Sequence, residues 1–292
     1  MHPRERSQNQ LSLGHTPSTG SPSRSAVSKR QVYEFWNRAA CGEELYLAGL
    51  DRAAYERQAR SRYELEPYIA EFARFEEARG LRVLEIGVGL GADHQRFAEA
   101  GAELYGIDLT PRAIEHTRRR LMLFGLRSKL AVADAEALPF RDEAFDLVYA
   151  WGVLHHTPDT PKAVAEVWRV LKLDGCARIM LYHKWSLVGL MLWTRYALLA
   201  LRPWWSLRQV YERYLESPGT KAYSVAEARE LFSAFRNVHT RIVLTHGDLL
   251  ASDVGQRHRG LLLSAARRLW PRWFFKRFCR RLRLFLLIEA RK

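Results

Sequence analysis

Three glycines in alternate positions stand between a short apolar run and a helical pattern. The run over residues 83–86 leads into Gly87, Gly89 and Gly91. Glycine lets the backbone turn sharply and lets a ligand approach without a Cβ in its path. In doubly wound sheets such a turn lies at the carboxyl end of a strand, where ligands bind. The pattern predicts a small-molecule site, and a tight turn without a ligand is the simpler alternative.

Further polar positions end the next strand-like runs. Asp108 closes AELYGID and Asp134 closes LAVAD. An acid at the end of the second strand is placed to accept hydrogen bonds from ribose hydroxyls. The fourth run, FDLVYAW, is followed by Gly152 and then by the pair His155 and His156. Four strand ends therefore direct glycines or polar side chains toward one crevice.

Taken together, these motifs resemble the class I S-adenosylmethionine-dependent methyltransferases, and closely the branch that methylates small molecules and lipids. The matching stretches are Glu85 to Gly91, Asp108, DAEALPF over residues 134–140, and FDLVYAWGVLHH. Each motif alone is weak, and their combination is specific. The resemblance implies a Rossmann-like domain with S-adenosylmethionine as its cofactor.

The resemblance also implies a role for each matched residue. The three glycines would pass the methionine part of the cofactor, and Glu85 would help to hold its amino end. Asp108 would bind the ribose. Asp134, with Ala135 beside it, would meet the adenine, and Trp151 would begin the segment beneath the cofactor.

A nicotinamide-dependent oxidoreductase is the nearest rival, because it also binds adenosine through an acid on the second strand. Its fingerprint is G-x-G-x-x-G, which seats a pyrophosphate on a helix N-terminus. This chain has G-x-G-x-G followed by Ala92 and Asp93. An acid in the first helical turn would repel a pyrophosphate, and a zwitterionic methionine end tolerates it better. The spacing therefore favours a methyltransferase.

Three histidines are candidates for a catalytic base. Methyl transfer from a sulfonium mainly needs proximity and orientation, and a base helps only where the acceptor has a proton to lose. His155 and His156 follow the fourth strand, and His183 ends the fifth. Neutral imidazole suits this role near neutral pH. The alternative for each is structural, because one of an adjacent pair usually faces away from the crevice.

Strand and helix signals alternate from residue 81 onward, which predicts an α/β fold. Pro111 and Pro161 sit at first-turn positions of two helices. We expect a doubly wound, mostly parallel, seven-stranded Rossmann-like sheet with helical insertions. Residues 1–28 are rich in Ser, Thr, Pro and Gly and predict a disordered tail. Residues 29–80 predict an N-terminal helical lid, with a helix packed on the sheet edge as the alternative.

The rest of the chain, over residues 81–292, is expected to form the Rossmann-like domain. A helical insertion is expected over about 185–235 and a basic amphipathic segment over about 256–283. The apolar stretch 185–201 is about the shortest length that could span a bilayer, but Arg195 interrupts it. A buried or membrane-surface helix is the preferred interpretation.

The basic segment carries two rows at four-residue spacing. One row holds Arg268, Arg272, Lys276 and Arg280, and the other holds Trp270, Phe274, Phe278 and Leu282. On a helix starting near Pro271 the rows lie on opposite faces, which suits an anionic membrane surface. An ordinary surface helix with solvated charges is the alternative.

The formal net charge of +14 also favours an anionic partner. Nucleic acid is the less favoured choice, because no motif of base methylation or RNA binding is present. The preferred acceptor is a small, hydrophobic or lipid-linked molecule. A nucleic-acid methyltransferase, or a non-catalytic module that binds the cofactor or a membrane surface, stays as the alternative.

The cysteines and the N-terminus indicate the compartment. Cys41, Cys176 and Cys279 are far apart and fit neither a metal-binding pattern nor a disulfide framework. No metal site is therefore expected. The N-terminus has no apolar segment of a secretory signal. We expect a cytoplasmic protein that is peripheral at the inner membrane surface if the basic segment contacts lipid.

Overall fold

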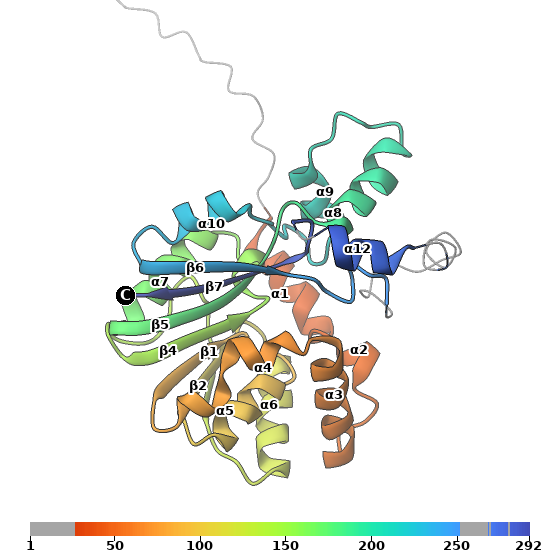
Figure 1. The fold of residues 1–292 in the computed structure, drawn as a ribbon. Helices are drawn as coiled ribbons and strands as arrows, with labels where there is room; N and C mark the ends of the chain where they lie inside the picture. The colour runs from red at the N-terminus through yellow and green to blue at the C-terminus, as the bar shows by residue number, and fades with distance from the viewer. Residues whose placement is uncertain (1–26, 252–267, 269, 280) are drawn as a thin grey trace, which may run out of the picture.

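The parallel core of the predicted sheet is present in the computed structural model, which describes residues 27–251, 268, 270–279 and 281–292. Within these residues seven strands form one sheet in the order β3-β2-β1-β4-β5-β7-β6 (Figure 1). Their bounds are β1 (Arg82–Ile86), β2 (Glu103–Asp108), β3 (Lys129–Val132), β4 (Phe145–Trp151), β5 (Leu171–Tyr182), β6 (Arg236–Val243) and β7 (Phe285–Arg291).

The five strands from β1 to β5 pair in parallel, whereas β7 runs antiparallel to both of its neighbours. β4 and β5 are buried over most of their length, as strands covered on both faces should be. In the register of β5 with β7, Ile179 lies opposite Ile288. The expected doubly wound, mostly parallel, seven-stranded sheet is thus confirmed.

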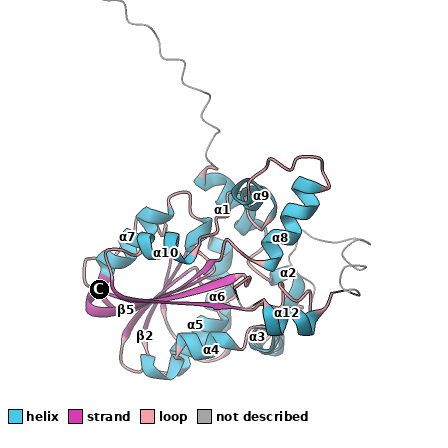
Figure 2. Cartoon of the chain, turned by 45° about the horizontal axis from the view of Figure 1, so that its top comes forward, coloured by secondary structure: helices cyan, strands magenta, loops and turns pink. Residues whose placement is uncertain are grey.

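Helices cover both faces of the sheet. Their bounds in the first half of the chain are α1 (Lys29–Arg38), α2 (Glu43–Tyr46), α3 (Arg52–Leu65), α4 (Tyr68–Ala73), η1 (Phe75–Ala78), α5 (Ala92–Glu99), α6 (Pro111–Leu123), η2 (Leu154–His156) and α7 (Thr160–Val170). The second half adds α8 (Leu187–Trp193), the π-helical η3 (Thr194–Leu198), α9 (Leu207–Tyr214), α10 (Val225–Leu231) and α12 (Arg272–Phe278). Figure 2 shows α7 and α10 on one side of the strands and α4 and α5 on the other.

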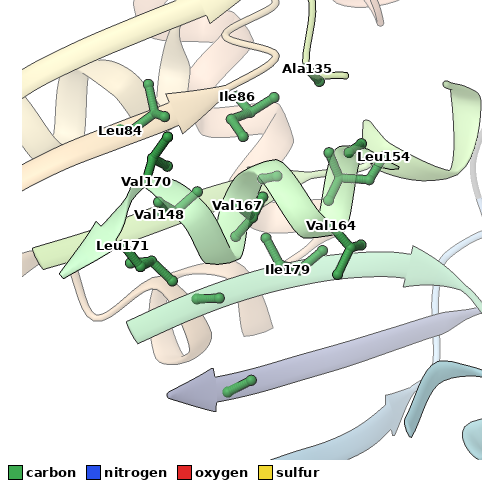
Figure 3. Close-up of a cluster of buried hydrophobic side chains, with 14 of the residues drawn as sticks. Leu84, Ile86, Ala135, Val148, Leu154, Val164, Val167, Val170, Leu171 and Ile179 are labelled. Atoms are coloured by element: carbon green, nitrogen blue, oxygen red, sulfur yellow. The ribbon is translucent and has the colours of Figure 1, made fainter. Parts of the chain in front are cut away.

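Local sequence sets where these helices begin. The Thr110 side chain caps α6, and Pro111 occupies its first turn. Asp159 caps α7 in the same way, and Pro161 follows within its first turn. Proline there loses no hydrogen bond and has the φ that a helix needs, so both predicted starts are confirmed. The apolar face of α7, with Val164 and Val167, then packs on β4 and β5 (Figure 3).

The N-terminal helices divide into two groups. α1 begins after a capping box between Ser28 and Gln31. Residues of α1, α2 and α3 line the cavity described below. In contrast, Ile69 and Phe72 of α4 and Phe75 of η1 join the hydrophobic core on one face of the sheet. The prediction of a lid over 29–80 is therefore too long at its C-terminal end, because residues 68–78 are part of the domain core.

The apolar stretch 185–201 forms two short helical elements instead of one long helix. The Ser186 side chain caps α8, and a π-helical turn follows it. Among the described residues no helix is long and apolar enough to cross a bilayer. Four helical elements, α8, η3, α9 and α10, occupy the expected insertion of about 185–235.

The basic segment differs from its sequence interpretation. Residues 256–267, 269 and 280 lie outside the described part of the chain, and so does the tail over 1–26. α12 begins after Pro271, as expected, but has only seven residues. Trp270 lies before the helix, where its ring stacks on Phe275 and its Nε1 donates to the carbonyl of Asp248. The predicted rows are therefore shorter than the sequence pattern, because packing onto the preceding loop fixes Trp270.

Candidate active site

A cavity of about 360 Å³ opens where the parallel strands end. One half of its wall comes from the turns after β1, β2 and β3. The other half comes from the ends of β4 and β5, the start of β7, the first turn of α8, the turn after α9 and the loop after β6. α1, α2 and α3 close a third side. Ligand sites of α/β sheets lie at this edge, so the sheet order brings two half-sites together.

The three glycines have different structural roles. All have positive φ, at +80° for Gly87, +52° for Gly89 and +75° for Gly91. A Cβ on Gly87 would meet Val153 at 2.1 Å, so the loop after β4 needs a glycine there. A Cβ on Gly91 would meet Thr117 of α6. A Cβ on Gly89 meets nothing within 4 Å, which shows that this residue faces open cavity.

Asp108 and Asp134 line the same half of the cavity. The Asp108 carboxylate accepts hydrogen bonds from the backbone and side chain of Thr110, both at 2.9 Å, and from the Gly89 backbone at 3.3 Å. Burial raises its pKa, and these donors oppose the shift. The carboxylate is thus oriented by its neighbours at the cavity wall.

The loop of Asp134 is tied to the N-terminal helix. Lys29 of α1 forms ion pairs with Asp134 and Glu136, the second at 2.7 Å. Burial lowers the pKa of Lys29, but the two hydrogen bonds outweigh it and the pKa is raised. Ala135 is buried between these acids. Asp134, which is expected to contact the adenine, therefore also holds α1 over the cavity.

Glu85 is buried beneath the glycine turn. Its Oε2 lies 2.8 Å from Nδ1 of His94, whose Nε2 lies 2.8 Å from Oγ of Ser128. Burial raises the pKa of Glu85 well above its usual range, and burial lowers that of His94 to about 3. Ser128 donates to the carbonyl of Leu104. Neutral His94 then donates from Nε2 to Ser128, and its Nδ1 accepts a hydrogen bond from the protonated Glu85.

Asp93, the acid in the first turn of α5, is buried and its charge is compensated. Arg62 of α3 binds both of its oxygens, at 3.0 and 2.7 Å, and the hydroxyls of Tyr63 and Tyr149 donate to it as well. Burial disfavours the charge, but Arg62 dominates and lowers the pKa of Asp93. Because its charge is compensated, repulsion of a pyrophosphate is a weaker argument than the sequence implied.

The second half of the cavity holds a group of polar side chains from three segments. Glu216 follows α9, His156 ends η2, and Tyr182 ends β5. The Tyr182 hydroxyl donates to Glu216 Oε2 at 2.6 Å, and His156 Nε2 lies 3.4 Å from the same oxygen. On its other side His156 Nδ1 lies 2.8 Å from the hydroxyl of Ser217. Trp36 of α1 meets the His156 ring edge-on.

The three candidate histidines are not brought together. His156 lines the cavity, whereas His155 and His183 do not. His155 is fully buried and packs on Tyr182, and among the described residues neither of its ring nitrogens has a hydrogen-bond partner. Burial lowers the pKa of both His155 and His183. His183 Nδ1 bonds the backbone carbonyl of Arg283. Of the three candidates, the geometry therefore leaves His156 at the site, where His246 from the loop after β6 also lines the cavity.

Several cavity residues carried no signal in the sequence. Arg62 lies in α3 and Glu66 directly follows that helix, in a stretch without a motif, and Glu216 lies in an irregular turn. Glu66 is buried beside Arg62, and Trp151, which was expected at this site, bonds to it. One signal could have pointed to Arg62. Asp93 lies in the first turn of α5, and a buried acid there needs a cation as partner.

Comparison with known proteins identifies the domain. The model of the methyltransferase domain family matches residues 84–179. These residues, about a third of the chain, form a class I S-adenosylmethionine-dependent methyltransferase domain. The sterol 4-C-methyltransferase of Caenorhabditis elegans is 34% identical over 113 residues, which cover 38% of this chain and 33% of the relative. The phthiotriol/phenolphthiotriol dimycocerosates methyltransferase of Mycobacterium leprae is 40% identical over 98 residues, covering 33% of this chain and 36% of the relative.

These matches span about a third of each curated relative, so they bear on the domain and not on the whole protein. Among solved structures, the phosphoethanolamine N-methyltransferase 2 of Haemonchus contortus is similar in fold. Its TM-score is 0.57 at 17% identity, covering 89% of this chain and 60% of that chain. The resemblance to a methyltransferase read from the sequence is confirmed, as is its Rossmann-like architecture.

The cavity fits the cofactor of this domain family. Gly89 leaves its wall open, as a bound ligand in contact with the backbone requires. Asp108 offers carboxylate oxygens at the end of β2 for ribose hydroxyls. Glu85 also lines the cavity beneath the glycine turn, on the side expected for the amino end. Together these residues match the polar parts of S-adenosylmethionine.

Proposed function

We propose that this chain transfers a methyl group from S-adenosylmethionine to a small, hydrophobic or lipid-linked acceptor by in-line displacement. The observation that carries the proposal is one continuous cavity with two halves. The glycine turn, Asp108 and Asp134 line the first half, and His156 and Glu216 line the second. Two ligands bound in the two halves would meet between them.

The chain contributes binding and orientation. When bound, the cofactor supplies an electrophilic methyl group. Glu85, Asp108 and Asp134 would hold its amino end, ribose and adenine, and Trp151 would support it from β4. α1 and α3 would exclude water from the reacting groups, since Trp36 and Arg62 line the cavity from that side. Proximity of this kind can supply most of the rate gain.

An apolar acceptor is supported by the lining of the second half. Met180, Val188, Leu215, Leu284 and Phe285 contribute to this wall. Apolar walls with a few placed polar groups are typical of small-molecule sites. By their names, two relatives methylate a sterol and a phthiotriol lipid, which agrees with such a wall.

A membrane surface is the partner that we propose for the whole molecule. Exposed apolar side chains gather on α8, η3 and the loop after them, and on α12. They are Trp185, Leu190, Leu198, Leu199, Leu201, Trp204, Trp273, Phe274 and Phe278. Figures 1 and 2 place α8 and α12 at the same end of the molecule. Single exposed apolar residues are ordinary, but a gathered set marks an interaction site.

This surface adjoins the cavity. Val188 lines the cavity in the first turn of α8. Arg272 of α12 donates to the carbonyls of Leu249 and Leu250, which directly follow the cavity residues 245–247. A lipophilic acceptor could therefore pass from a bilayer into the second half of the cavity. Exposed Arg202 and Arg277 favour an anionic surface.

Cofactor binding is the first test. Calorimetry should show micromolar binding of S-adenosylmethionine and its demethylated product, and weaker binding of nicotinamide dinucleotides. Asp108→Ala should weaken binding by about 1.5–3 kcal/mol, the scale for hydrogen bonds to a charged group. Glu103→Ala, at the exposed start of the same strand, is the control. Tighter binding of a dinucleotide would contradict the proposal.

The acceptor is identified by mass spectrometry of the methylated product. The protein is incubated with methyl-labelled cofactor and a total lipid extract, in parallel with a water-soluble metabolite extract. We expect the label in the lipid fraction. Label confined to soluble metabolites or to added RNA would replace the proposed acceptor class, and no label with intact cofactor binding would indicate a non-catalytic module.

A further inference from the structure

The cavity is rich in carboxyl groups. Six acids line the cavity as a whole, namely Glu66, Glu85, Asp93, Asp108, Asp134 and Glu216. Among the described residues that line it, two side chains are Lys or Arg, and both are engaged by acids. Lys29 is paired with Asp134 and Glu136, and Arg62 with Asp93 and Glu66. An anionic group in this cavity would meet cations that are already paired.

Three of these acids are not expected to bind the cofactor, and of the three Asp93 is already held by Arg62. Asp108 and Asp134 stand at the ends of β2 and β3, and Glu85 lies under the glycine turn. Glu216 comes from the turn after α9 and contacts residues of β5 and η2. Glu66 bonds Trp151 at the end of β4. The sheet order separates these two from the adenosine side.

Glu216 is held in place by defined contacts. Its Oε2 receives the Tyr182 hydroxyl at 2.6 Å and faces His156 Nε2 at 3.4 Å. Ser217, the next residue, holds the other ring nitrogen of His156 at 2.8 Å. The His156 ring is thus fixed by Ser217 with its Nε2 edge toward Glu216. The carboxylate is therefore oriented from two sides at the cavity wall.

Glu216 and Glu66 also act on each other. The charge of Glu216 adds to burial in raising the pKa of Glu66, to about 7. Both acids line the same cavity, where the local dielectric is low. A negative charge brought between them would meet the carboxyl oxygens of both and be disfavoured, whereas a hydrogen-bond donor would be attracted.

We propose that Glu216, oriented by Tyr182 and His156, binds the acceptor through a hydroxyl or amine that donates a hydrogen bond, and that Glu216 and Glu66 together reject anionic head groups such as phosphates. This inference rests on the proposed function and names the chemistry of its acceptor. It separates this chain from an enzyme whose acceptor carries a phosphate near the methylated atom. Like-charge rejection is a common way to gain specificity.

The test compares three single-chain probes of equal length, which are decylamine, 1-decanol and decyl phosphate. Each is titrated below its aggregation concentration into the protein by calorimetry, with and without S-adenosylhomocysteine. We expect decylamine and decanol to bind at least about tenfold more tightly than decyl phosphate, a difference expected from a like charge at low dielectric. Glu216→Gln should weaken decylamine and reduce this discrimination.

Glu212→Gln is the matched control. Glu212 lies on α9 four residues earlier, pairs with Arg208, and does not line the cavity. It should leave all three affinities unchanged, so that binding of probes elsewhere on the surface is recognised. Equal affinities for the three probes in the wild-type protein, tighter binding of decyl phosphate, or an unchanged preference in Glu216→Gln would overturn the inference. Loss of S-adenosylhomocysteine binding alone would count against the proposed function instead.

Discussion

Gly89 and Gly125 have similar backbones in different surroundings. Their φ angles are +52° and +69°, and a Cβ on either meets nothing within 4 Å. Only Gly89 lines the cavity. Valine at either position costs backbone strain of about 1–3 kcal/mol, but only at position 89 does the side chain fill the path of a ligand.

We therefore expect Gly89→Val to abolish binding of S-adenosylhomocysteine, measured by calorimetry. Gly125→Val should bind normally while its Tm falls by a similar few degrees. This pair separates loss of the site from loss of stability. Normal binding by Gly89→Val would show that the cofactor does not pass this residue.

Glu66 should make stability depend on pH. Burial raises its pKa from 4.5 to about 7. The folded state then binds the proton more tightly than the unfolded chain, so the stabilisation is complete below about 4.5 and is lost as pH rises through about 7. Glu66→Gln should gain about 1–3 kcal/mol relative to wild type at pH 8. At pH 4.5 the difference should vanish.

Urea unfolding at both pH values measures this effect. Glu64→Gln changes an exposed acid two residues earlier on α3 and should leave the pH dependence as in wild type. If Glu66→Gln and wild type differ equally at pH 4.5 and pH 8, then Glu66 is ionised in the folded protein across that range.

At the level of single residues, the sequence was informative where a local pattern fixes the backbone. Gly87, Gly89, Gly91 and Asp108 could be placed because strand ends and turns have recognisable neighbours. Glu216 could not, because it sits in an irregular turn and reaches the site through the path of the chain after α9. Sequence patterns record local geometry, and this contact depends on tertiary packing.

Among the elements, caps and periodicity predicted the starts of α6 and α7 and the seven-stranded sheet. Around α4 and before α12 the structure differs from the sequence interpretation for one shared reason. The apolar residues of α4 and η1, and Trp270 before α12, pack on neighbouring elements. A periodic pattern shows that a face is apolar, but it does not identify what covers that face.

The N-terminal helix α1 is attached to the domain through the side chain of Lys29. Lys29 joins α1 to the acids of the loop after β3. Lys29→Ala should increase amide exchange of residues 29–38 roughly fivefold, as expected for losing about 1 kcal/mol of a partly exposed pair. Arg30→Ala removes a pair within the helix itself and is the control.

Hydrogen–deuterium exchange followed by mass spectrometry measures both variants, with and without S-adenosylhomocysteine. Closure over the cofactor should slow exchange in α1 of the wild-type protein, and less so in Lys29→Ala. Exchange in α1 that ignores both the mutation and the ligand would mean that this helix is not a lid.

For the whole molecule, one end of the sheet carries the cavity, the helices over it and the exposed apolar surface. This arrangement follows from the parallel strands, whose carboxyl ends all face that way. The net charge of +14 adds long-range attraction toward anionic surfaces. Charge alone would attract nucleic acid equally, so the apolar side chains decide between the two partners.

Substitutions at Trp273 and Met122 test whether the apolar side chains determine membrane binding. Both residues are 71% exposed, but only Trp273 lies on the surface around α8 and α12. Co-sedimentation should show binding to phosphatidylglycerol vesicles, little binding to phosphatidylcholine vesicles, and loss at high salt, since each basic residue near the surface contributes about 1 kcal/mol that salt screens. Trp273→Glu should weaken vesicle binding at least about tenfold through lost burial and added repulsion. Met122→Glu, which adds the same charge on α6, should bind as wild type does. An equal loss of vesicle binding in the two variants would mean that only the net charge attracts the protein to the membrane. No binding of the wild-type protein to either vesicle would exclude the membrane as partner.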